Sequence, residues 1–377
     1  MGRGSGVTRV PAFAAAHRKL AGNAFARVLL RPLAWIWQAA AAARRYLYRR
    51  QILNVHRLPR PVIGVGNLAL GGAGKTPFVI FLGQYLVNHG VHVAIISRGY
   101  GRASQGRVLV RRAGESVKVG ESLVGDEALM IARALPEASV VVAEDRVAAA
   151  AWAIDDLGAG IILLDDAFQG LRLKKDLNVL LLDARRPPGP VFPAGYYREG
   201  PAAARAADLV VFTKCRENDF RNRWLGVLEQ AGASAPRVEV KFSASYLRPL
   251  NREERLGLGK LEGAKVLAFA GIADFDHFAD DLAEAGAVVA RRRPFPDHHR
   301  FTHGELADAE GTALVAGCDF LVTTAKDEAR LEGWRPAVLT YVLEQAVEII
   351  TEFDVLNDFL DRIISAVRLR GGTDVAT

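Results

Sequence analysis

The run Asn67-Leu-Ala-Leu-Gly-Gly-Ala-Gly-Lys-Thr-Pro77 stands between two apolar segments of different character. Residues 61–66, Pro-Val-Ile-Gly-Val-Gly, are short and β-prone, whereas the longer run 78–86 has the composition of a buried helix. A strand, a glycine-rich turn, a Lys-Thr pair and a helix, in that order, form the layout of a P-loop. The sequence therefore predicts a phosphate-binding loop within an α/β fold.

The residue types of this loop suit a nucleoside triphosphate. Its glycines allow the backbone to curl so that N–H groups face phosphate oxygens, and the N-terminus of the following helix adds its dipole. Lys75 is expected to contact the β- and γ-phosphates, and the Thr76 hydroxyl to bind Mg²⁺. The predicted cofactors are ATP and Mg²⁺, and the predicted nucleotide-binding residues are Ala69, Leu70, Gly71, Gly72, Ala73, Gly74, Lys75 and Thr76. Ala69 departs from the usual first glycine, and a glycine-rich turn with an accidental lysine is the alternative.

A second strand-like run supplies acids for a metal ion. The segment Gly160-Ile-Ile-Leu-Leu-Asp-Asp166 places two carboxylates directly after four apolar residues. Ligands gather at the carboxyl ends of strands in an open α/β sheet, so Asp165 or Asp166 is expected to hold Mg²⁺, directly or through water. The alternative is an aspartate that caps a helix.

Apolar β-like runs recur along the chain and alternate with helix-like segments such as 126–135 and 145–157. The alternation predicts a P-loop parallel sheet flanked by helices. Near residue 245 the pattern restarts, with β-like runs at 266–270 and 320–324 around a helix-like run at 275–285, which predicts a second, smaller α/β domain. The expected parts are a basic amphipathic N-terminal arm at 1–55, an ATP-binding domain at 56–240, and the smaller domain at 241–377 with linker strands and a C-terminal helix.

The charge of the chain is divided unevenly. The 377 residues carry a net charge of +7, yet residues 1–114 contain 18 of the 49 Lys and Arg residues and none of the 42 Asp and Glu residues. A cationic end on an otherwise mildly acidic chain points to a nucleic acid, an anionic membrane surface or a phosphate-rich ligand. Half of the residues are hydrophobic and only two are cysteines, which excludes a disordered tail and a disulfide-dense secreted scaffold.

The N-terminal arm has the composition of a helix that lies in a membrane interface. Its uncharged run of 12 residues, 32–43, is shorter than the ~18–20 residues that span a bilayer. Aromatic residues such as Phe25 and Tyr46 alternate with arginines, as in helices whose rings reach headgroup depth and whose cations meet anionic lipid. A signal peptide, a first core helix and a nucleic-acid-binding arm are the alternatives; the membrane-surface interpretation is favoured, with no nucleic acid as partner.

At this point the chain resembles the lipid A 4′-kinases, the tetraacyldisaccharide 4′-kinase family. Their phosphate loops resemble 65–77 here and also lack the first glycine. The further matches follow in the family's order: Ser97-Arg-Gly-Tyr-Gly-Arg102, Val124-Gly-Asp-Glu127, Asp165-Asp-Ala-Phe-Gln169, Pro193-Ala-Gly195, Arg198-Glu199, Ala270-Gly-Ile272, Phe295-Pro-Asp-His298 and Thr323-Thr-Ala-Lys-Asp327. The resemblance runs from about residue 25 to 330. Ala167, Gly170, Tyr196 and Ala325 stand where the family usually has other residues, which bears on substrate details more than on the phosphoryl chemistry.

The resemblance implies a reaction, a substrate and a place in the cell. The reaction is transfer of the ATP γ-phosphoryl group to the 4′-hydroxyl of a tetraacyl glucosamine disaccharide 1-phosphate, a lipid A precursor. The location is the cytoplasmic face of the bacterial inner membrane, where the protein is peripheral or monotopic and the arm meets the anionic surface. No obligate protein partner is inferred. By the same resemblance Asp126 is the catalytic base, paired with His298, and Lys75 acts with them; on sequence alone, Asp126 also suits a helix N-cap.

Two further groups of residues and one absent motif bear on the function. Arg98, Tyr100 and Arg102 follow a β-like run, and their guanidinium and ring groups suit a phosphorylated sugar; a glycine turn with solvated arginines is the alternative. The histidines of 297–303 include an i, i+4 pair that suits zinc, although the prolines before them favour a loop. A regulatory GTPase would need an Asn-Lys-x-Asp motif, which the sequence lacks. A soluble P-loop kinase of another sugar or small-molecule hydroxyl is the remaining alternative.

Overall fold

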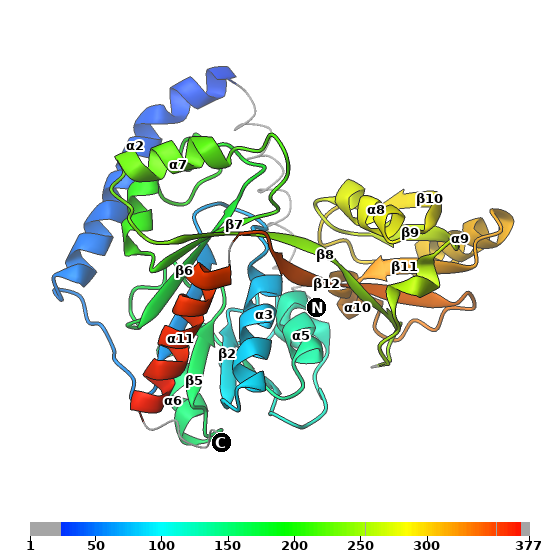
Figure 1. Cartoon of the computed structure of the whole chain (residues 1–377), viewed down its shortest axis with the longest axis horizontal. Coiled ribbons are helices and arrows are strands. Elements are labelled where there is room, and N and C mark those ends of the chain that lie inside the picture. The colour runs from blue at the N-terminus through cyan, green and yellow to red at the C-terminus, as the bar shows by residue number, and fades with distance from the viewer. Residues whose placement is uncertain (1–23, 253, 352, 371–377) are drawn as a thin grey trace, which may run out of the picture.

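The computed structural model describes residues 24–252, 254–351 and 353–370. A single sheet of twelve mostly parallel strands runs through these residues, in the order β10-β9-β11-β12-β8-β7-β6-β1-β5-β2-β4-β3 (Figure 1). The strands are β1 Val62–Asn67, β2 Val93–Ser97, β3 Val108–Arg111, β4 Ser139–Val142, β5 Ile161–Leu164, β6 Leu177–Asp183, β7 Leu209–Thr213, β8 Arg237–Pro249, β9 Lys265–Ala270, β10 Val288–Pro294, β11 Phe320–Thr324 and β12 Thr340–Ile349. The predicted mixed α/β fold is confirmed.

Helices cover both faces of the sheet. They are α2 Ala24–Arg49, α3 Lys75–Asn88, α4 Glu121–Val124, α5 Asp126–Ala134, α6 Arg146–Asp155, α7 Arg221–Gln230, α8 Phe275–Glu284, α9 His303–Val315, α10 Ala325–Glu328 and α11 Phe353–Leu369. Short 3₁₀ turns occupy Pro201–Ala206, Leu258–Leu261 and Ala329–Leu331. Alternate residues of β6 explain the layering, because Val179 and Leu181 join the core under α3, α5 and α11, while Leu180 and Leu182 join the core under α2 and α7.

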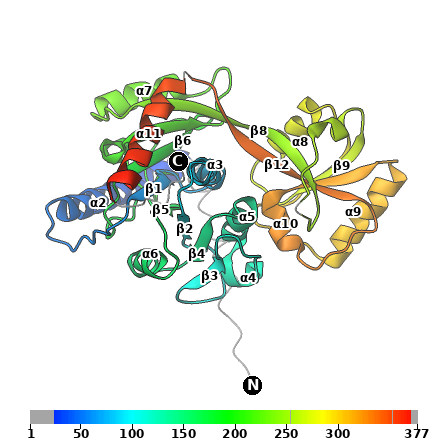
Figure 2. The ribbon, with the colours of Figure 1, turned by 60° about the horizontal axis from the view of Figure 1, so that its bottom comes forward.

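Two lobes share this sheet, and a pair of long strands joins them (Figure 2). The first lobe contains β1 to β7, and the smaller lobe contains β9, β10 and β11 with α8, α9 and α10. β8 leaves the first lobe beside β7, with Val210 opposite Arg237, and β12 returns antiparallel to it, with Tyr341 opposite Pro249 and Ile349 opposite Val240. β8 and β12 are thus the two strands that link the lobes.

The C-terminal helix α11 packs on the P-loop lobe. Its apolar side, including Leu356, Phe359 and Ile363, is buried in the same core as α3 and β1 (Figure 1). We expected this helix to accompany the smaller unit within 241–377, and its packing corrects that expectation. The physical reason is the return of β12, which brings the chain back to the first lobe before the helix begins. The domain boundaries themselves stay a prediction.

Several elements carry no strong sequence signal and were not predicted. β3 and β10 lie at the two edges of the sheet, where half-exposed strands lack the continuous apolar run of a buried parallel strand. In β10, Arg291 and Arg292 are exposed. Helix α7 is polar overall and lacks an apolar run that would mark it in the sequence.

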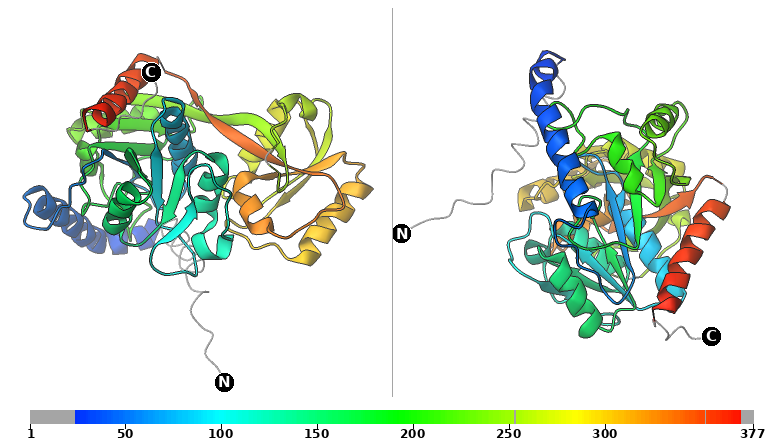
Figure 3. Two further views of the ribbon diagram at one scale, coloured as in Figure 1. Left: turned by 90° about the horizontal axis from the view of Figure 1, so that it is seen from below. Right: turned by 90° about the vertical axis from the view of Figure 1, so that its left-hand side faces the viewer.

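Helix α2 lies along the outside of the first lobe with one side against it (Figure 3). Ala34 and Leu30 pack against the core that contains Trp224 of α7 and Phe168. The opposite side of α2 remains exposed and is apolar, with Val28, Leu29, Leu33 and Ile36 all more than half accessible to solvent. Among the described residues, no helix has the length and apolar character that crossing a membrane requires.

Candidate active site

The P-loop forms where it was predicted, between the buried strand β1 and the N-terminus of α3. Gly74 adopts a left-handed conformation with φ 74°, and a side chain there would collide with the ring of Phe242. At Gly71 and Gly72 a side chain would project into open space, so the loop presents uncovered backbone on that side. Thr213 and Lys214, at the end of β7, donate hydrogen bonds to Ala73 O and Gly72 O, each at 3.0 Å. These two contacts hold the loop against the end of β7.

Lys75, the first residue of α3, faces a carboxylate from the end of β5. Its Nζ lies 3.5 Å from Oδ1 of Asp166, and Nη1 of Arg198 lies 3.0 Å from Oδ2 of the same side chain. Burial tends to raise the pKa of Asp166, but the charges of Lys75 and Arg198 outweigh burial and hold the pKa below its usual range. The structure thus brings together the predicted Lys75 and Asp166. It adds Arg198, which belongs to a family motif but had no predicted role.

Asp165 is buried and only partly satisfied. Ser97 donates a hydrogen bond to Oδ2 at 3.2 Å, whereas Oδ1 finds no hydrogen-bond partner among the described residues. Burial, with the nearby negative charge of Glu127, raises the pKa of Asp165 to about 7. A buried carboxylate oxygen without a partner is costly, and oxygen ligands of this kind are those that Mg²⁺ prefers. Residues 165–176 contain turns and no helix, so the helix-cap alternative for this aspartate pair is wrong.

Asp126 and His298, 172 residues apart in the chain, meet across the gap between the lobes. Nδ1 of His298 lies 3.0 Å from Oδ2 of Asp126, at the N-terminus of α5. Arg330 of the smaller lobe contacts the same oxygen, and its Nη1 lies 2.9 Å from Oδ1 of Asp327. The other oxygen of Asp126 accepts the backbone N–H of Glu127 at 2.9 Å. Asp126 is the first residue of α5 and Gly125 is the N-cap, so the N-cap alternative for Asp126 is wrong.

The charges around this pair favour an ionised Asp126. Burial alone would raise its pKa, but the hydrogen bond from His298 and the positive charges of Arg330 and Lys326 hold the pKa well below its usual range. Nζ of Lys326 lies 3.2 Å from Nε2 of His298 and 2.8 Å from Oδ1 of Asp297. Nη2 of Arg330 also lies 3.1 Å from Nδ1 of His298, so each ring nitrogen of His298 faces a cation, and Nδ1 faces the Asp126 carboxylate as well.

A buried ionic cluster fixes the two lobes beside this pair. Glu328 of α10 receives two hydrogen bonds from Arg248 of β8, at 2.7 and 2.6 Å, and lies 3.1 Å from Arg133 at the far end of α5. Figure 2 shows α5 and α10 facing each other at this point. On the opposite side of the gap, Arg185 of the first lobe contacts Asp274, which caps α8. The helix that carries Asp126 is thus held at both ends by the smaller lobe.

The loop after β2 reaches the same region. Gly99 packs so closely that an added side chain would lie 2.9 Å from Val124 O, and one at Gly125 would lie 3.0 Å from Tyr100 O. Arg98 and Tyr100 are exposed, as a ligand contact requires. Arg102 differs, since its guanidinium is only 3% exposed and already contacts Glu144, Gly106 O and Ser104. Of the three predicted substrate residues, Arg98 and Tyr100 are the two whose side chains face solvent.

Sequence reasoning missed several charged groups that support the site. Arg146 of α6 donates to the backbone carbonyls of Asp165 and Asp166, at 2.9 and 3.1 Å, and so holds the turn after β5. Arg330 and Lys326 complete the surroundings of Asp126. Nothing in local spacing marks Arg146 or Arg330 among the other arginines; only Lys326 stood within a noted motif.

The histidine-rich run 297–303 does not form the zinc site that was considered from the sequence. His299 of the histidine-rich run pairs with Glu305 at 3.0 Å, and no group of three or more His, Cys, Asp or Glu within the described ranges is arranged to hold a metal.

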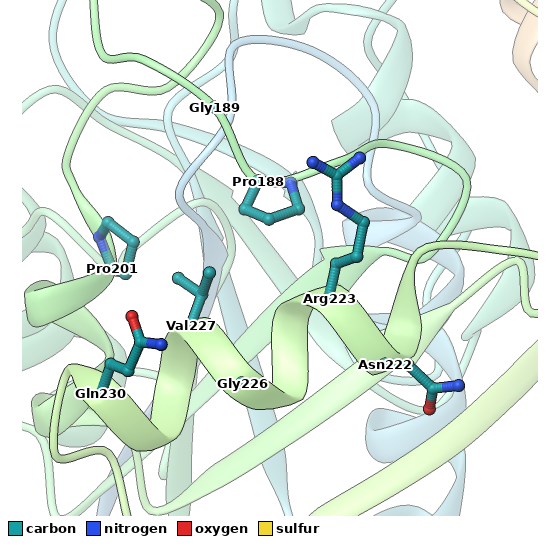
Figure 4. Close-up of a pocket in the computed structure, with 8 residues that line it drawn as sticks. All are labelled: Pro188, Gly189, Pro201, Asn222, Arg223, Gly226, Val227 and Gln230. Carbon is teal, nitrogen blue, oxygen red and sulfur yellow. The ribbon is translucent and has the colours of Figure 1, made fainter.

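A surface cavity of about 480 Å³ opens between α7 and the preceding loop (Figure 4). It is lined by Pro188, Gly189, Pro201, Asn222, Arg223, Gly226, Val227 and Gln230, none of them a predicted site residue.

Comparison with known proteins agrees with this geometry. The sequence profile of the family described as "Tetraacyldisaccharide-1-P 4'-kinase" matches residues 26–365. The tetraacyldisaccharide 4′-kinase of Pelobacter propionicus is 35% identical over 85% of this chain and 88% of its own length, and that of Geobacter metallireducens is 38% identical over 80% and 88%. A crystal structure of LpxK from Aquifex aeolicus in complex with ATP is 31% identical and superposes with a TM-score of 0.71, covering 89% of this chain and 99% of that one. On these grounds the chain belongs to the tetraacyldisaccharide 4′-kinase family.

Proposed function

We propose that this protein transfers the γ-phosphoryl group of ATP to the 4′-hydroxyl of a tetraacyl glucosamine disaccharide 1-phosphate, giving the 1,4′-bisphosphate. Family membership over most of the chain supports the reaction. The observation that carries the mechanism is the contact of Asp126 with His298 next to the P-loop. The P-loop and Asp126 lie in neighbouring elements, because α3, which begins at Lys75, and α5, which begins at Asp126, pack in the same core.

The P-loop holds the triphosphate in this proposal. The backbone N–H groups of residues 69–74 and the N-terminus of α3 face the phosphate oxygens, and Lys75 places its ammonium on the β- and γ-phosphates. Arg198, which lies against Asp166, is a second cation within the same group of charges. Phosphoryl transfer depends mainly on such positioning and charge neutralisation, since the transferred group carries its charge on three oxygens.

The residues present fit a bound Mg²⁺. The Thr76 hydroxyl and the Asp165 carboxylate would hold it, with Asp166 beside them, because Oδ1 of Asp165 is buried without a partner among the described residues. When bound, the ion neutralises charge on the β- and γ-phosphates. Asp166 contributes less as a direct ligand in this arrangement, since Lys75 and Arg198 already occupy both of its oxygens.

Asp126 acts as the base toward the 4′-hydroxyl. Its low pKa keeps it ionised at neutral pH, so it can accept a hydrogen bond from the hydroxyl at all times. In a loose transition state the hydroxyl becomes acidic only as its oxygen bonds to phosphorus, and a weak base then suffices to take the proton. The contact with Nδ1 of His298 orients the carboxylate throughout. Arg98 and Tyr100 are proposed to contact the acceptor, whose 1-phosphate suits a guanidinium.

The exposed side of α2 provides a surface for the membrane that contains the acceptor. Val28, Leu29, Leu33 and Ile36 form one apolar side, and arginines such as Arg31 and Arg44 flank it. A helix of this kind lies in the interface, with its apolar side among acyl chains and its cations on anionic headgroups. We therefore place the protein on the cytoplasmic face of the inner membrane, as a peripheral or monotopic enzyme.

One assay tests the reaction directly. The purified protein in detergent is incubated with γ-labelled ATP and tetraacyl-disaccharide 1-phosphate, and label in the extracted lipid is measured. We expect label at the 4′ position and none on free glucosamine. Transfer to soluble sugars but not to the lipid would favour the alternative, a soluble P-loop kinase, and absence of transfer to any acceptor would refute the proposal.

A second experiment tests the membrane surface separately. Leu29→Glu combined with Ile36→Glu is expected to move the protein from sedimented vesicles that contain anionic lipid to the supernatant, because both side chains are exposed and apolar. Leu314→Glu, at an equally exposed leucine of α9, is the control. Equal sedimentation of both variants and the wild type would contradict the surface that we assign.

A further inference from the structure

A short segment separates α2 from the P-loop and contacts both. We call residues Tyr196–Glu199 the seam. On its inner side, Leu70 N donates to Tyr196 O at 2.7 Å and Arg198 N donates to Leu68 O at 2.6 Å, and Ala69 forms a bridge with Tyr197. The seam therefore runs as an added strand along the start of the phosphate loop.

On its outer side the seam is held by α2. Nε1 of Trp37 donates to Arg198 O at 2.8 Å. About two turns further along the helix, the Arg45 guanidinium binds Glu199 with two nitrogens, Nη2 to Oε1 at 3.0 Å and Nε to Oε2, and lies over the Phe168 ring at 5.0 Å. The Arg45 side chain is largely buried against the first lobe, at 18% exposure, whereas Trp37 lies at the edge of the contact and is 46% exposed.

Arg198 carries this arrangement to the phosphate site. Its backbone is fixed between Leu68 and Trp37, and its guanidinium reaches Asp166 at 3.0 Å and Oε1 of Gln169 at 3.3 Å. Asp166 in turn lies 3.5 Å from the Lys75 ammonium. An uninterrupted set of contacts thus leads from α2 through the seam to the residues around the γ-phosphate position.

We propose that Trp37 and Arg45 are positioning residues for phosphoryl transfer, which hold the seam so that Arg198 stays on Asp166. Helix α2 then has two separate tasks on its two sides, one toward the membrane and one as a wall of the nucleotide site. The proposal rests on the proposed function for its kinetic test, and on the backbone hydrogen bonds of the seam for a test that needs no catalysis. It predicts that loss of these contacts slows the reaction without releasing the protein from lipid.

The kinetic test compares matched substitutions on the same helix. Trp37→Phe removes one donor and keeps a ring, and it should lower kcat about 5-fold; Trp35→Phe, at an indole that is 69% exposed, should change kcat less than 2-fold. Arg45→Met should lower kcat about 20-fold and Arg49→Met, at an exposed position, less than 2-fold. The KM for the lipid and the fraction bound to vesicles should not change. Unaltered kcat in both Trp37→Phe and Arg45→Met would overturn the proposal.

A double-mutant cycle and hydrogen exchange separate this role from general destabilisation. If Arg45 acts through Glu199, Arg45→Met should cost no further activity in a Glu199→Gln background, whereas additive losses would overturn the proposal. Peptides that contain Leu70 and Arg198 should exchange their amide hydrogens at least 10-fold faster in Arg45→Met than in the wild type, with peptides from the smaller lobe unchanged. Unchanged exchange at Leu70 and Arg198 would also overturn it, even in a protein that proved to lack kinase activity.

Discussion

The two halves of the site are built in opposite ways. The nucleotide half comes from one continuous motif and leaves groups open, with uncovered backbone at Gly71 and Gly72 and an unpartnered oxygen on the buried Asp165. The base half joins Asp126 to residues 172 and 204 positions away, and its charges are paired. The nucleotide half binds charged ligands, so it needs polar groups without protein partners. The base half must keep the Asp126 carboxylate ionised, so it needs its charged partners in place.

The largest effect is expected in the nucleotide half. Lys75→Met should lower kcat/KM by about 10³-fold, because no other described side chain at the start of α3 can put a positive charge on the phosphates. Label transfer from ATP measures it, and Lys118→Met, at a lysine that is 76% exposed, is the control. A loss below 10-fold would mean that the open loop binds its ligand in some other way, and the comparison of halves would fail.

Asp126→Asn tests the base half and should leave the other half intact. The expected loss in kcat is about 10²- to 10³-fold, the usual contribution of a positioned base, while the affinity for ATP measured by equilibrium binding stays within 2-fold. His298→Gln should cost about 10-fold, since it removes the orienting hydrogen bond and keeps the carboxylate. A large loss of ATP affinity in Asp126→Asn would show that the two halves are not separable.

The nucleotide half could be predicted from sequence because its geometry is local. A strand, glycines and Lys-Thr specify one loop whatever surrounds them, and the aspartate pair follows from the strand that precedes it. Asp126 and His298 came from family resemblance rather than spacing, since nothing near either residue indicates a partner 172 positions away. Arg330, Arg146 and the contacts of Arg45 depend on how the lobes and α2 pack, and surface arginines look alike in sequence. Arg102 shows the reverse error, a motif arginine whose guanidinium is used inside the fold.

The inter-lobe cluster gives a test of stability. Glu328→Gln should lower the free energy of unfolding by about 2 kcal/mol, because it removes a buried carboxylate that pairs with the buried Arg248 and the partly exposed Arg133. Glu348→Gln, which weakens an exposed pair with Lys241, should change it by less than about 0.5 kcal/mol. Urea unfolding followed by circular dichroism measures both. Equal effects would mean that the base half does not depend on this buried cluster.

The smallest effect concerns the unpartnered Asp165. In the protein without metal its pKa is about 7, above the 3.8 of the free side chain. Above pH 7 the folded state therefore carries a charge that burial disfavours, and the cost of this charge to stability falls away as the pH decreases from 7 towards 4. Asp165→Asn should therefore raise the free energy of unfolding by about 1–2 kcal/mol at pH 8 in a chelating buffer, and by much less at pH 5. A destabilised variant at pH 8 would contradict the picture of an open, strained nucleotide half.

The paired strands β8 and β12 also affect how the chain can be made. Because the smaller lobe is inserted between them, α11 emerges from the ribosome only after that whole lobe, although it covers the core of the first. At usual elongation rates the apolar side of the P-loop sheet waits on the order of ten seconds for its cover. The two ends of the inserted lobe lie side by side, where Pro249 of β8 faces Tyr341 of β12. All strands of this lobe have therefore been synthesised before α11 appears. A nascent chain of this family therefore presents its nucleotide-binding lobe to chaperones for longer than the lobe that is synthesised after it.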